Sequence, residues 1–435
     1  MAMQVQSLPF DAEEVIHFSE KRNEPKWFTD IRLKALGLAE ELPLPKPEKT
    51  RIDDWNFTNF IFDTVGKPVA NLTELPENVG QLIGKKEKAG NVLIHHNGDR
   101  VYRSLSQDLS RKGVIFTDLA TALQENGELV KKYYFKTASV EKHKLSALHA
   151  ALVNGGSFLY VPKNVVVDVP VQAVYFQDNP SSGLVAHTII VAEANSSVTF
   201  VENYLSTASA GEGVANLISE VTVGENANVK YGAVDHFTDG IVTYVNRQGD
   251  VSRDGSLQWA LGQMNDGNTV SENATNLQGD GSSVDTKAVS IGSGSQKQNF
   301  DNYIHHVGKA TISRLLVRGA QKDASNSIFN ARTKIEHGAS GADGEQTQRV
   351  LMLSDESRGD ANPILLIDEY DVIAGHAASV GRVDPDQLYY LMSRGIKKET
   401  AEKLIVEGFL EPVVDLLPIE GVRKQLVALI ERKVG

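Results

Sequence analysis

The segment VTVGENANV, residues 221–229, contains the pattern that decides the fold. It places β-branched residues on both sides of a turn of small and polar residues, which is typical of two short strands joined by a turn. Similar segments recur from residue 158 onward, and long helical patterns are absent there. The turns that resemble one another are ANSSV (194–198), ENANV (225–229), RDGSL (253–257), GSSV (281–284) and GKATI (308–312).

The apolar residues that close these turns are regularly spaced. They are Val198, Val229, Leu257, Val284 and Ile312. The successive differences in sequence position are 31, 28, 27 and 28. A period near 28 with strands on both sides of each turn indicates a β-helix, in which each coil adds strands to parallel sheets. Further small-residue turns, such as the one at positions 292–295, fall midway and favour two main sheets. We therefore predict a mainly β fold, with a parallel β-helix over residues 157–372.

The segment before the β-helix, residues 1–156, is predicted to be a mainly helical cap. A helix is expected after Pro25, because apolar residues recur about every four positions from Trp27 to Leu38. The prolines of residues 43–47 end it. The ends of a β-helix expose unpaired backbone groups, so a cap at this position is physically reasonable.

Helical periodicity returns in residues 373–435, which we predict to be a C-terminal helical domain. Asp384 is a suitable N-cap, with Pro385 at the first helical position. Gly395 suits the left-handed position after that helix. A second helix is expected to stop around Gly408 and Pro412, and a third follows.

Composition excludes several function classes. The net charge of −12 and the pI near 5.5 disfavour nucleic acid and anionic membranes as partners. The segment from Met1 to Glu20 lacks the pattern of a secretory signal, and no apolar run approaches the length of a membrane span, so we expect a cytoplasmic protein. The chain has no cysteine, which excludes disulfides, thiolate nucleophiles and a cysteine-held iron-sulfur cluster within this chain alone.

Several motifs resemble one protein family. The segment DPDQLYYLMSRGI, residues 384–396, followed by EGF at 407–409, resembles the C-terminal signature of the SufB and SufD proteins of iron-sulfur cluster assembly. The segments EPKW (24–27), followed by Arg32, and WNFT (55–58) resemble the N-terminal region of the SufD branch. The resemblance covers nearly the whole chain. SufB-like subunits carry cysteines implicated in sulfur transfer, so the absence of cysteine favours the SufD branch.

The resemblance implies a fold and a function. The fold is a right-handed parallel β-helix between helical terminal domains, and the function is that of a non-catalytic scaffold. SufB would pair through the β-helix, and the ATPase SufC would dock on the C-terminal helices. Pairing of the isolated chain with itself also stays open, because the edges of a β-helix can pair with a second copy.

His376 is the candidate residue for handling iron. It aligns with a family histidine implicated at the SufB–SufD interface, and imidazole is a competent iron ligand. Some SufD proteins carry a cysteine two residues earlier, where this chain has Ala374. We therefore expect no cofactor to be bound stably by this chain alone, and any transient iron or cluster at the interface would need ligands from SufB. The alternative is a structural histidine at a strand-to-helix junction.

The candidate SufC-docking residues lie on the helix that begins after Asp384. They are Tyr389, Tyr390, Met392 and Arg394. Aromatic residues and arginine are enriched in the hot spots of protein interfaces. Helical geometry places Met392 with the apolar stripe and the other three elsewhere, so part of this set could instead be core.

A second class of function is a carbohydrate-active enzyme, since many turn positions carry aspartate. The aspartates concerned are Asp254, Asp266, Asp280, Asp285, Asp301 and Asp323. Their irregular spacing favours solvated turns over a catalytic row. The histidines at 95–96, 305–306 and 337 are predicted to be structural or surface residues, because adjacent residues on a strand point to opposite faces. No nucleotide-binding loop occurs in the sequence, so ATP would belong to the partner.

Overall fold

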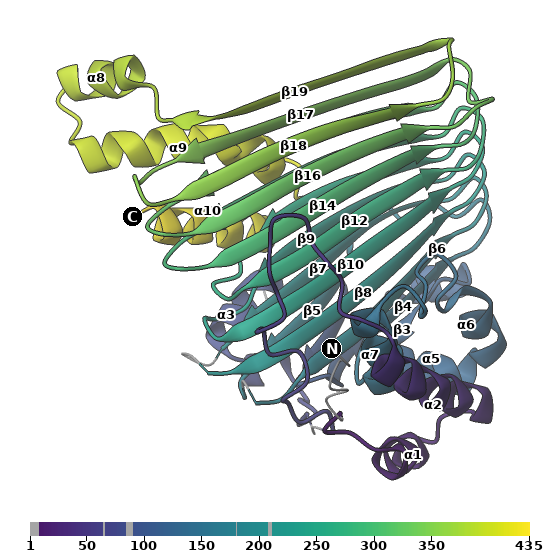
Figure 1. Ribbon diagram of the computed structural model, residues 1–435. Helices are drawn as coiled ribbons and strands as arrows, with labels where there is room; N and C mark the ends of the chain where they lie inside the picture. The colour runs from purple at the N-terminus through teal and green to yellow at the C-terminus, as the bar shows by residue number, and fades with distance from the viewer. Residues whose placement is uncertain (1–7, 64–65, 84–89, 180, 208–210) are drawn as a thin grey trace, which may run out of the picture.

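The computed structural model describes residues 8–63, 66–83, 90–179, 181–207 and 211–435. It consists of a long parallel β-helix with helices at both ends of the chain (Figure 1). This arrangement confirms the predicted fold class. Successive strands alternate between two sheets, so each coil of the chain adds one strand to each sheet.

The two sheets contain ten and nine strands. The ten-stranded sheet has the order β19 (Val372–Arg382), β17 (Ala342–Met352), β15 (Ile312–Gln321), β13 (Ser283–Gly292), β11 (Ser256–Gln263), β9 (Asn228–His236), β7 (Ser197–Ser206), β5 (Val171–Gln177), β1 (Asn91–His96) and β2 (Asp99–Ser104). The nine-stranded sheet has the order β18 (Arg358–Ile367), β16 (Asn326–Ile335), β14 (Lys297–His306), β12 (Thr269–Leu277), β10 (Ile241–Val251), β8 (Gly213–Val223), β6 (Leu184–Ala192), β4 (Ser157–Val161) and β3 (Ile115–Asp118).

The helices lie at the two ends of the sequence. The N-terminal ones are α1 (Ala12–Lys21), α2 (Lys26–Glu41), α3 (Glu77–Ile83), α4 (Gln107–Arg111), α5 (Leu119–Glu125), α6 (Gly127–Tyr133) and α7 (Lys144–Leu152), with a short 3₁₀ turn at Leu72–Glu74. The C-terminal ones are α8 (Pro385–Ser393), α9 (Lys398–Val414) and α10 (Glu420–Val434).

Left-handed residues mark one turn of each coil. The positions are Asn164, Asn195, Asn226, Asp254, Gly281, Ala310 and Gly341, all with positive φ. Asparagine, aspartate and glycine tolerate this conformation better than other residues, which is why the turns resemble one another in sequence. The asparagines also form a ladder, since the Asn226 amide donates to Asn195 and the Asn195 amide donates to Asn164, each at 2.9 Å.

The register follows the predicted period, with one correction. Val198, Val229, Leu257 and Val284 are in-register neighbours and buried. Ile312, which the spacing placed in the same column, instead pairs with Ser283 and is 45% exposed. The step between these coils is therefore one residue longer than the spacing predicted, and a shift of one residue moves a side chain to the other face of a sheet.

The hydrophobic core has three main parts. The largest fills the interior between the two sheets. A second lies between the N-terminal helices and the outer face of the nine-stranded sheet, where α7 packs near Val185 and Ile189. A third lies under α9 and α10, which cover the outer face of the ten-stranded sheet around Val201 and Val234. The C-terminal helices are therefore packed on the side of the β-helix.

The strands run past both predicted limits of the β-helix segment. Residues before 157 contribute β1, β2 and β3, and β19 extends to Arg382, beyond residue 372. The segment AGHAA, residues 374–378, has no β-branched residue, so the sequence pattern did not identify it as a strand.

The predicted stop of the second C-terminal helix was wrong. Helix α9 continues through Gly408 and contains Pro412 in its last turn. A proline there removes one intrahelical hydrogen bond. Burial of Leu410, Val413 and Val414 against the β-helix offsets that cost. The predicted start of α8 is confirmed, because the Asp384 carboxylate accepts a hydrogen bond from the Asp386 backbone at 2.9 Å.

Candidate interaction sites at the open end of the β-helix

The last coil of the β-helix leaves two edge strands. β18 ends the nine-stranded sheet and β19 ends the ten-stranded sheet, and no other described strand pairs with their outer edges. Large hydrophobic side chains are exposed on these strands and on the turn that joins them: Leu366, Ile367, Tyr370, Ile373 and Val380. Unpaired edges with exposed apolar residues are ready to pair with another strand. We call this region the open end.

His376 lies in the middle of β19, and its side chain is exposed. It is in register with Gln346 on β17, and Val380 on the same strand is in register with Val350, which belongs to the interior core. Because side chains alternate between faces, His376 lies on the face that continues the interior of the β-helix. The predicted strand-to-helix junction is therefore not its location.

Two buried amides lie next to His376. Gln346 and Gln348 on β17 are buried, and the side-chain oxygen of each has no hydrogen-bond partner among the described residues. The Gln346 amide nitrogen donates to Thr333 Oγ1 at 3.0 Å and to the Ile364 carbonyl at 2.9 Å. The sequence analysis missed both glutamines. The only signal in the sequence is that polar residues occupy alternate positions of this strand. The strand register is needed to recognise those positions as inward-facing.

Helix α8 presents the predicted docking residues to solvent. Tyr389 is 74%, Tyr390 56% and Met392 43% exposed, and α8 has no buried residue. The Arg394 guanidinium lies 5.2 Å from the Tyr390 ring centroid, so these two residues form one cation–π pair. Met392 was expected to share the apolar stripe of the helix, but it lies at the surface together with the tyrosines.

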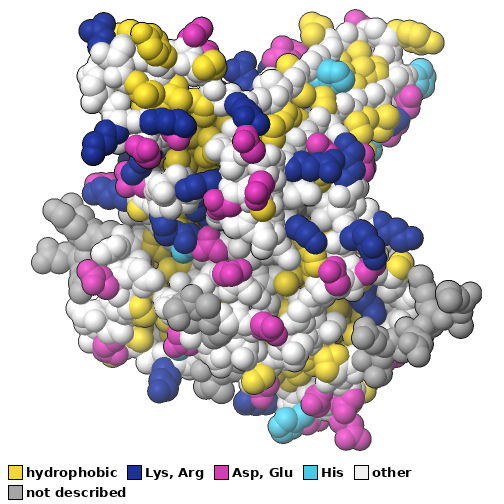
Figure 2. All heavy atoms as spheres, turned by 60° about the vertical axis from the view of Figure 1, so that its left-hand side comes forward, with side chains coloured by type: hydrophobic (Ala, Val, Ile, Leu, Met, Phe, Trp, Pro, Cys, Tyr) yellow, Lys and Arg dark blue, Asp and Glu magenta, His cyan; other side chains and the backbone are white. Residues whose placement is uncertain are grey.

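A hydrophobic groove separates these helices from the open end. It has a volume of about 530 Å³ and lies between β17 and β19 on one side and α8 and α9 on the other. Its apolar lining residues are Val350, Leu351, Val380, Val383, Leu404, Ile405 and Phe409. Figure 2 shows hydrophobic side chains gathered in a hollow at the top of the molecule, between two projecting lobes.

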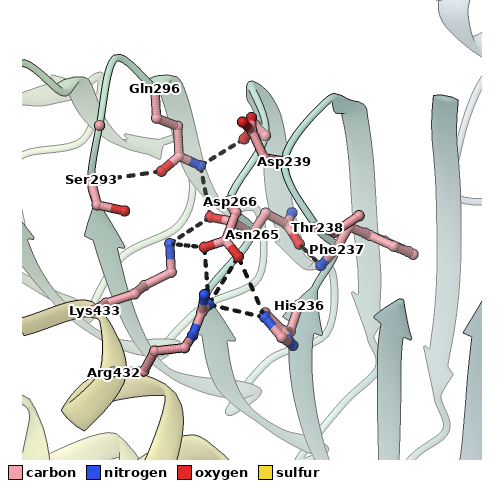
Figure 3. A network of polar contacts seen from close by, with 12 residues as sticks. His236, Phe237, Thr238, Asp239, Asn265, Asp266, Ser293, Gln296, Arg432 and Lys433 are labelled. Atoms are coloured by element: carbon pink, nitrogen blue, oxygen red, sulfur yellow. Dashed lines mark hydrogen bonds and ion pairs between the residues drawn. The ribbon is translucent and has the colours of Figure 1, made fainter. Parts of the chain in front are cut away.

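A polar network fixes the last turn of α10 to the β-helix (Figure 3). Asp266 accepts hydrogen bonds from Arg432 at 2.9 Å and pairs with Lys433 at 2.8 Å. Burial alone would raise the pKa of Asp266, but the hydrogen bond from His236 and the charges of Lys433 and Arg432 outweigh it, and the pKa lies well below its usual range. Burial also lowers the pKa of Lys433. Hence α10 is anchored to the β-helix, whereas α8 contacts α9 and has no buried residue.

The five other histidines singled out from the sequence have local partners. His95 is buried and stacks on Tyr175 with ring centroids 4.4 Å apart, and His306 contacts Thr311 and Ser313. The remaining three lie close to a carboxylate each: His96 to Asp178, His305 to Glu336 and His337 to Glu369. In the part of the chain that the structure describes, no group of three or more histidine, aspartate or glutamate side chains is arranged to hold a metal ion.

The aspartates predicted at coil turns are also engaged locally, but the structure places Asp285 on β13 and Asp301 on β14 rather than at turns. Asp301 pairs with Arg332, and Asp266 anchors α10. Asp280 accepts a hydrogen bond from the Lys309 backbone at 2.7 Å, and Asp323 accepts one from the Gly294 backbone at 2.8 Å. These carboxylates tie neighbouring coils together. Among the described residues, no helix has the length and apolar character needed to cross a membrane.

Comparisons with known proteins agree with this architecture. The model of the SufBD core domain of the SUF system for FeS cluster assembly matches residues 175–409, and the model of the SufBD N-terminal region matches residues 90–173. The chain belongs to the SufBD family of iron-sulfur cluster assembly proteins.

Within that family the similarity to SufD is high. The chain is 57% identical to the iron-sulfur cluster assembly protein SufD of Bacillus subtilis (strain 168), over 430 residues that cover 98% of both chains. It is 30% identical over 416 residues to an iron-sulfur cluster assembly SufBD family protein of Staphylococcus aureus (strain USA300), which covers 93% of this chain and 89% of the relative. The predicted family resemblance is therefore confirmed.

Proposed function

We propose that this chain is a non-catalytic scaffold subunit of a cytoplasmic iron-sulfur cluster assembly complex. The observation that carries this proposal is the open end, where both sheets finish in unpaired strands with exposed hydrophobic residues. An open β-helix end is stabilised when a partner covers it. In this proposal the partner is SufB, which pairs along β18 and β19.

The ATPase SufC docks on α8 and the adjoining part of α9. Tyr389, Tyr390, Met392 and Arg394 supply exposed aromatic, apolar and guanidinium groups, which are the usual anchors of protein interfaces. The groove between these helices and β19 allows a docked subunit to act on the edge strands. Because α10 is anchored by Asp266 and the C-terminal part of α9 is packed on the β-helix, a docked subunit would move α8 relative to these two helices.

Iron or a cluster is a cargo in this proposal, handled at the interface with SufB. His376 is the one candidate ligand on the inner face of β19, and Ala374 two residues earlier offers no donor. A single imidazole cannot hold a cluster, so the remaining ligands come from SufB. His376→Ala should leave complex formation intact and lower the iron content of the assembled complex, and an unchanged iron content would return His376 to a structural role.

Co-expression of the tagged chain with SufB and SufC of the same organism tests the scaffold role. Affinity purification followed by light scattering should give the mass of one SufB, one copy of this chain and two SufC. Recovery of this chain alone or as a homodimer, with SufB and SufC expressed and soluble, would contradict the proposal. Turnover of a polysaccharide, abolished by Asp280→Asn or by substitution of another turn aspartate, would instead favour the enzyme alternative.

A further inference from the structure

An extended segment crosses the outer face of the nine-stranded sheet. We call residues 42–63 the strap; in Figure 1 it is the purple trace that leaves α2, rises across the strands and turns back. Its N-terminal end is fixed by a hydrogen bond from the Lys144 backbone to the Pro43 carbonyl at 2.8 Å. Its C-terminal end is fixed by a hydrogen bond from the Ile61 backbone to the Ser181 carbonyl at 2.9 Å. Between these points the strap reaches far beyond the N-terminal helices.

The tip of the strap is a tight turn at residues 47–50. The Thr50 backbone donates to the Pro47 carbonyl at 3.2 Å, and Lys49 has a φ of 56°. A left-handed conformation is uncommon for a residue other than glycine, asparagine or aspartate, so it needs support from contacts of the side chain or its neighbours. The Lys49 ammonium finds that support on β18, where it donates to Asn362 Oδ1 at 2.8 Å and lies 3.6 Å from Asp360.

A chain of three amides joins both sides of this turn through the sheet. The Asn362 amide donates to Asn330 at 3.0 Å, and the Asn330 amide donates to Asn299 at 3.5 Å. The Asn299 amide then donates back to the strap, to the Glu48 carbonyl and to Thr50 Oγ1, each at 2.8 Å. All the donors point the same way, from the Lys49 charge toward the Glu48 carbonyl, and hydrogen bonds aligned in this way reinforce one another.

Polar contacts at the tip and apolar packing behind it hold the strap on this part of the sheet. A cavity of about 260 Å³ lies beneath residues 45–48, lined by Lys46 and by polar residues of β12, β14 and β16 such as Glu272 and Asp301. Residues 45–48 therefore cross the middle coils over a cavity, whereas Ile52, Trp55 and Phe57 are buried in the hydrophobic cluster that contains Val242 and Val270. The tip adds specific polar contacts with β14 and β18. Of these two strands, β18 is the free edge of its sheet, and no described strand lies on its outer side to hold it.

We infer that the strap is a clamp that holds edge strand β18, through Lys49 and the amide chain, in the geometry needed to pair with a strand of SufB. This inference rests on the proposed function, because it assumes that SufB pairs at the open end. It adds a positioning role for Lys49, Asn362, Asn330 and Asn299. An edge strand that is already ordered loses less conformational freedom on pairing, so affinity rises with the order of β18.

The test compares Lys49→Ala, Asn362→Ala and the double variant with the unmodified full-length chain. Hydrogen–deuterium exchange of the peptide covering β18 is measured first, without partner. We expect each single variant to speed exchange there about two- to fivefold, as fits the loss of one partly exposed charged contact. The double variant should add little, because both substitutions break the same contact. Affinity for purified SufB is then expected to fall by a similar factor in each.

Lys46→Ala is the matched control, since it removes the same charge from the same strap, over the cavity, and should change neither measurement. Unchanged exchange in β18 for both Lys49→Ala and Asn362→Ala would overturn the clamp. Faster exchange with unchanged SufB affinity would overturn its role in pairing. Failure of the unmodified chain to bind SufB would instead contradict the proposed function, and the exchange experiment would still report on the clamp.

Discussion

At the N-terminal end of the β-helix, β2 and β3 pair antiparallel with β1 and β4, and the helices α1, α2 and α7 pack against the sheets. At the open end, β18 and β19 finish in free edges, and the helices lie at the side. The N-terminal end, which we call the closed end, has aromatic clusters and a buried ion pair. The difference separates an end that is covered by packed helices from an end that leaves strand edges and apolar side chains exposed.

The largest expected effect is at the closed end, at Arg32. This side chain is 1% exposed, pairs with Glu24 at 2.7 Å and donates to the carbonyls of Ala151 and Val153. Arg32→Met leaves the Glu24 carboxylate buried without its partner, so the free energy of unfolding should fall by about 3–5 kcal/mol in urea denaturation. Lys34→Ala, which breaks an exposed pair with Glu141, should have a far smaller effect. If both variants lowered the free energy of unfolding equally, the buried ion pair would not be a special source of stability at the closed end.

The second effect is a pH dependence that originates at His95. Burial lowers its pKa from 6.5 to about 4. Below pH 6.5 the histidine takes up a proton in the unfolded state but stays neutral in the folded state. Proton binding then stabilises the unfolded state, so the free energy of unfolding falls. The contribution of His95 to the free energy of unfolding should therefore be constant above pH 6.5 and decline by about 3 kcal/mol as the pH falls from 6.5 toward 4. Buried His149 and His306, whose pKa values are also lowered, add to the decline of the whole protein. Urea denaturation across this range should show a shallower decline in His95→Leu, and an identical slope would contradict the assignment.

A smaller effect is expected in the coil turns between the two ends. Ala310 has a φ of 52° and is the only residue of its column that is neither asparagine, aspartate nor glycine. Ala310→Gly should raise the free energy of unfolding by about 0.5–1 kcal/mol, because glycine adopts this conformation without the clash of a Cβ atom. Thermal unfolding is the measurement. Ala324→Gly, at an exposed turn residue without a positive φ, should be destabilising by a similar amount.

The smallest effect on stability is expected at the open end. Ile373 is 68% exposed, so Ile373→Asp should change the free energy of unfolding by less than about 0.5 kcal/mol. The same substitution should abolish co-purification with SufB, since it places a charge on the pairing edge. Ile16→Asp, at a partly exposed isoleucine of α1, should leave co-purification intact. If Ile373→Asp lowered the free energy of unfolding but still co-purified with SufB, the open end would contribute to stability rather than to pairing.

The sequence predicted the coils well because local chemistry sets them. Turn residues that tolerate positive φ recur once per coil, and β-branched residues flank them, so the period could be counted directly. The position of Ile312 was missed because one added residue between coils changes the face without changing the pattern. The full length of β19 was not recognised, because the small residues around His376 lack the β-branched pattern of a strand.

Contacts between distant residues were beyond the reach of the sequence. Asp235 and Arg247 form a buried pair at 2.7 Å, and buried Glu202 accepts a hydrogen bond from Thr188 at 2.5 Å, although each would be expected at the surface. The strap depends on amides that lie far along the chain, such as Asn362, which is 313 positions from Lys49. No local period encodes such pairs. The candidate docking residues on α8 were chosen from the family resemblance of their segment and from their residue types, but their exposure required the structure.

The strap also acts as a measure of length. Each coil advances the sheet by about 4.8 Å, the spacing between neighbouring strands. The strap starts and ends at the closed end and places Lys49 on the last strand of its sheet. Insertion of one coil would move β18 a full strand spacing away, and deletion of one would bring Lys49 past the edge. Repeat proteins commonly gain and lose coils, but in this chain such a change would need a matching change in the strap, which ties the number of coils to the length of a segment that precedes the β-helix in the sequence.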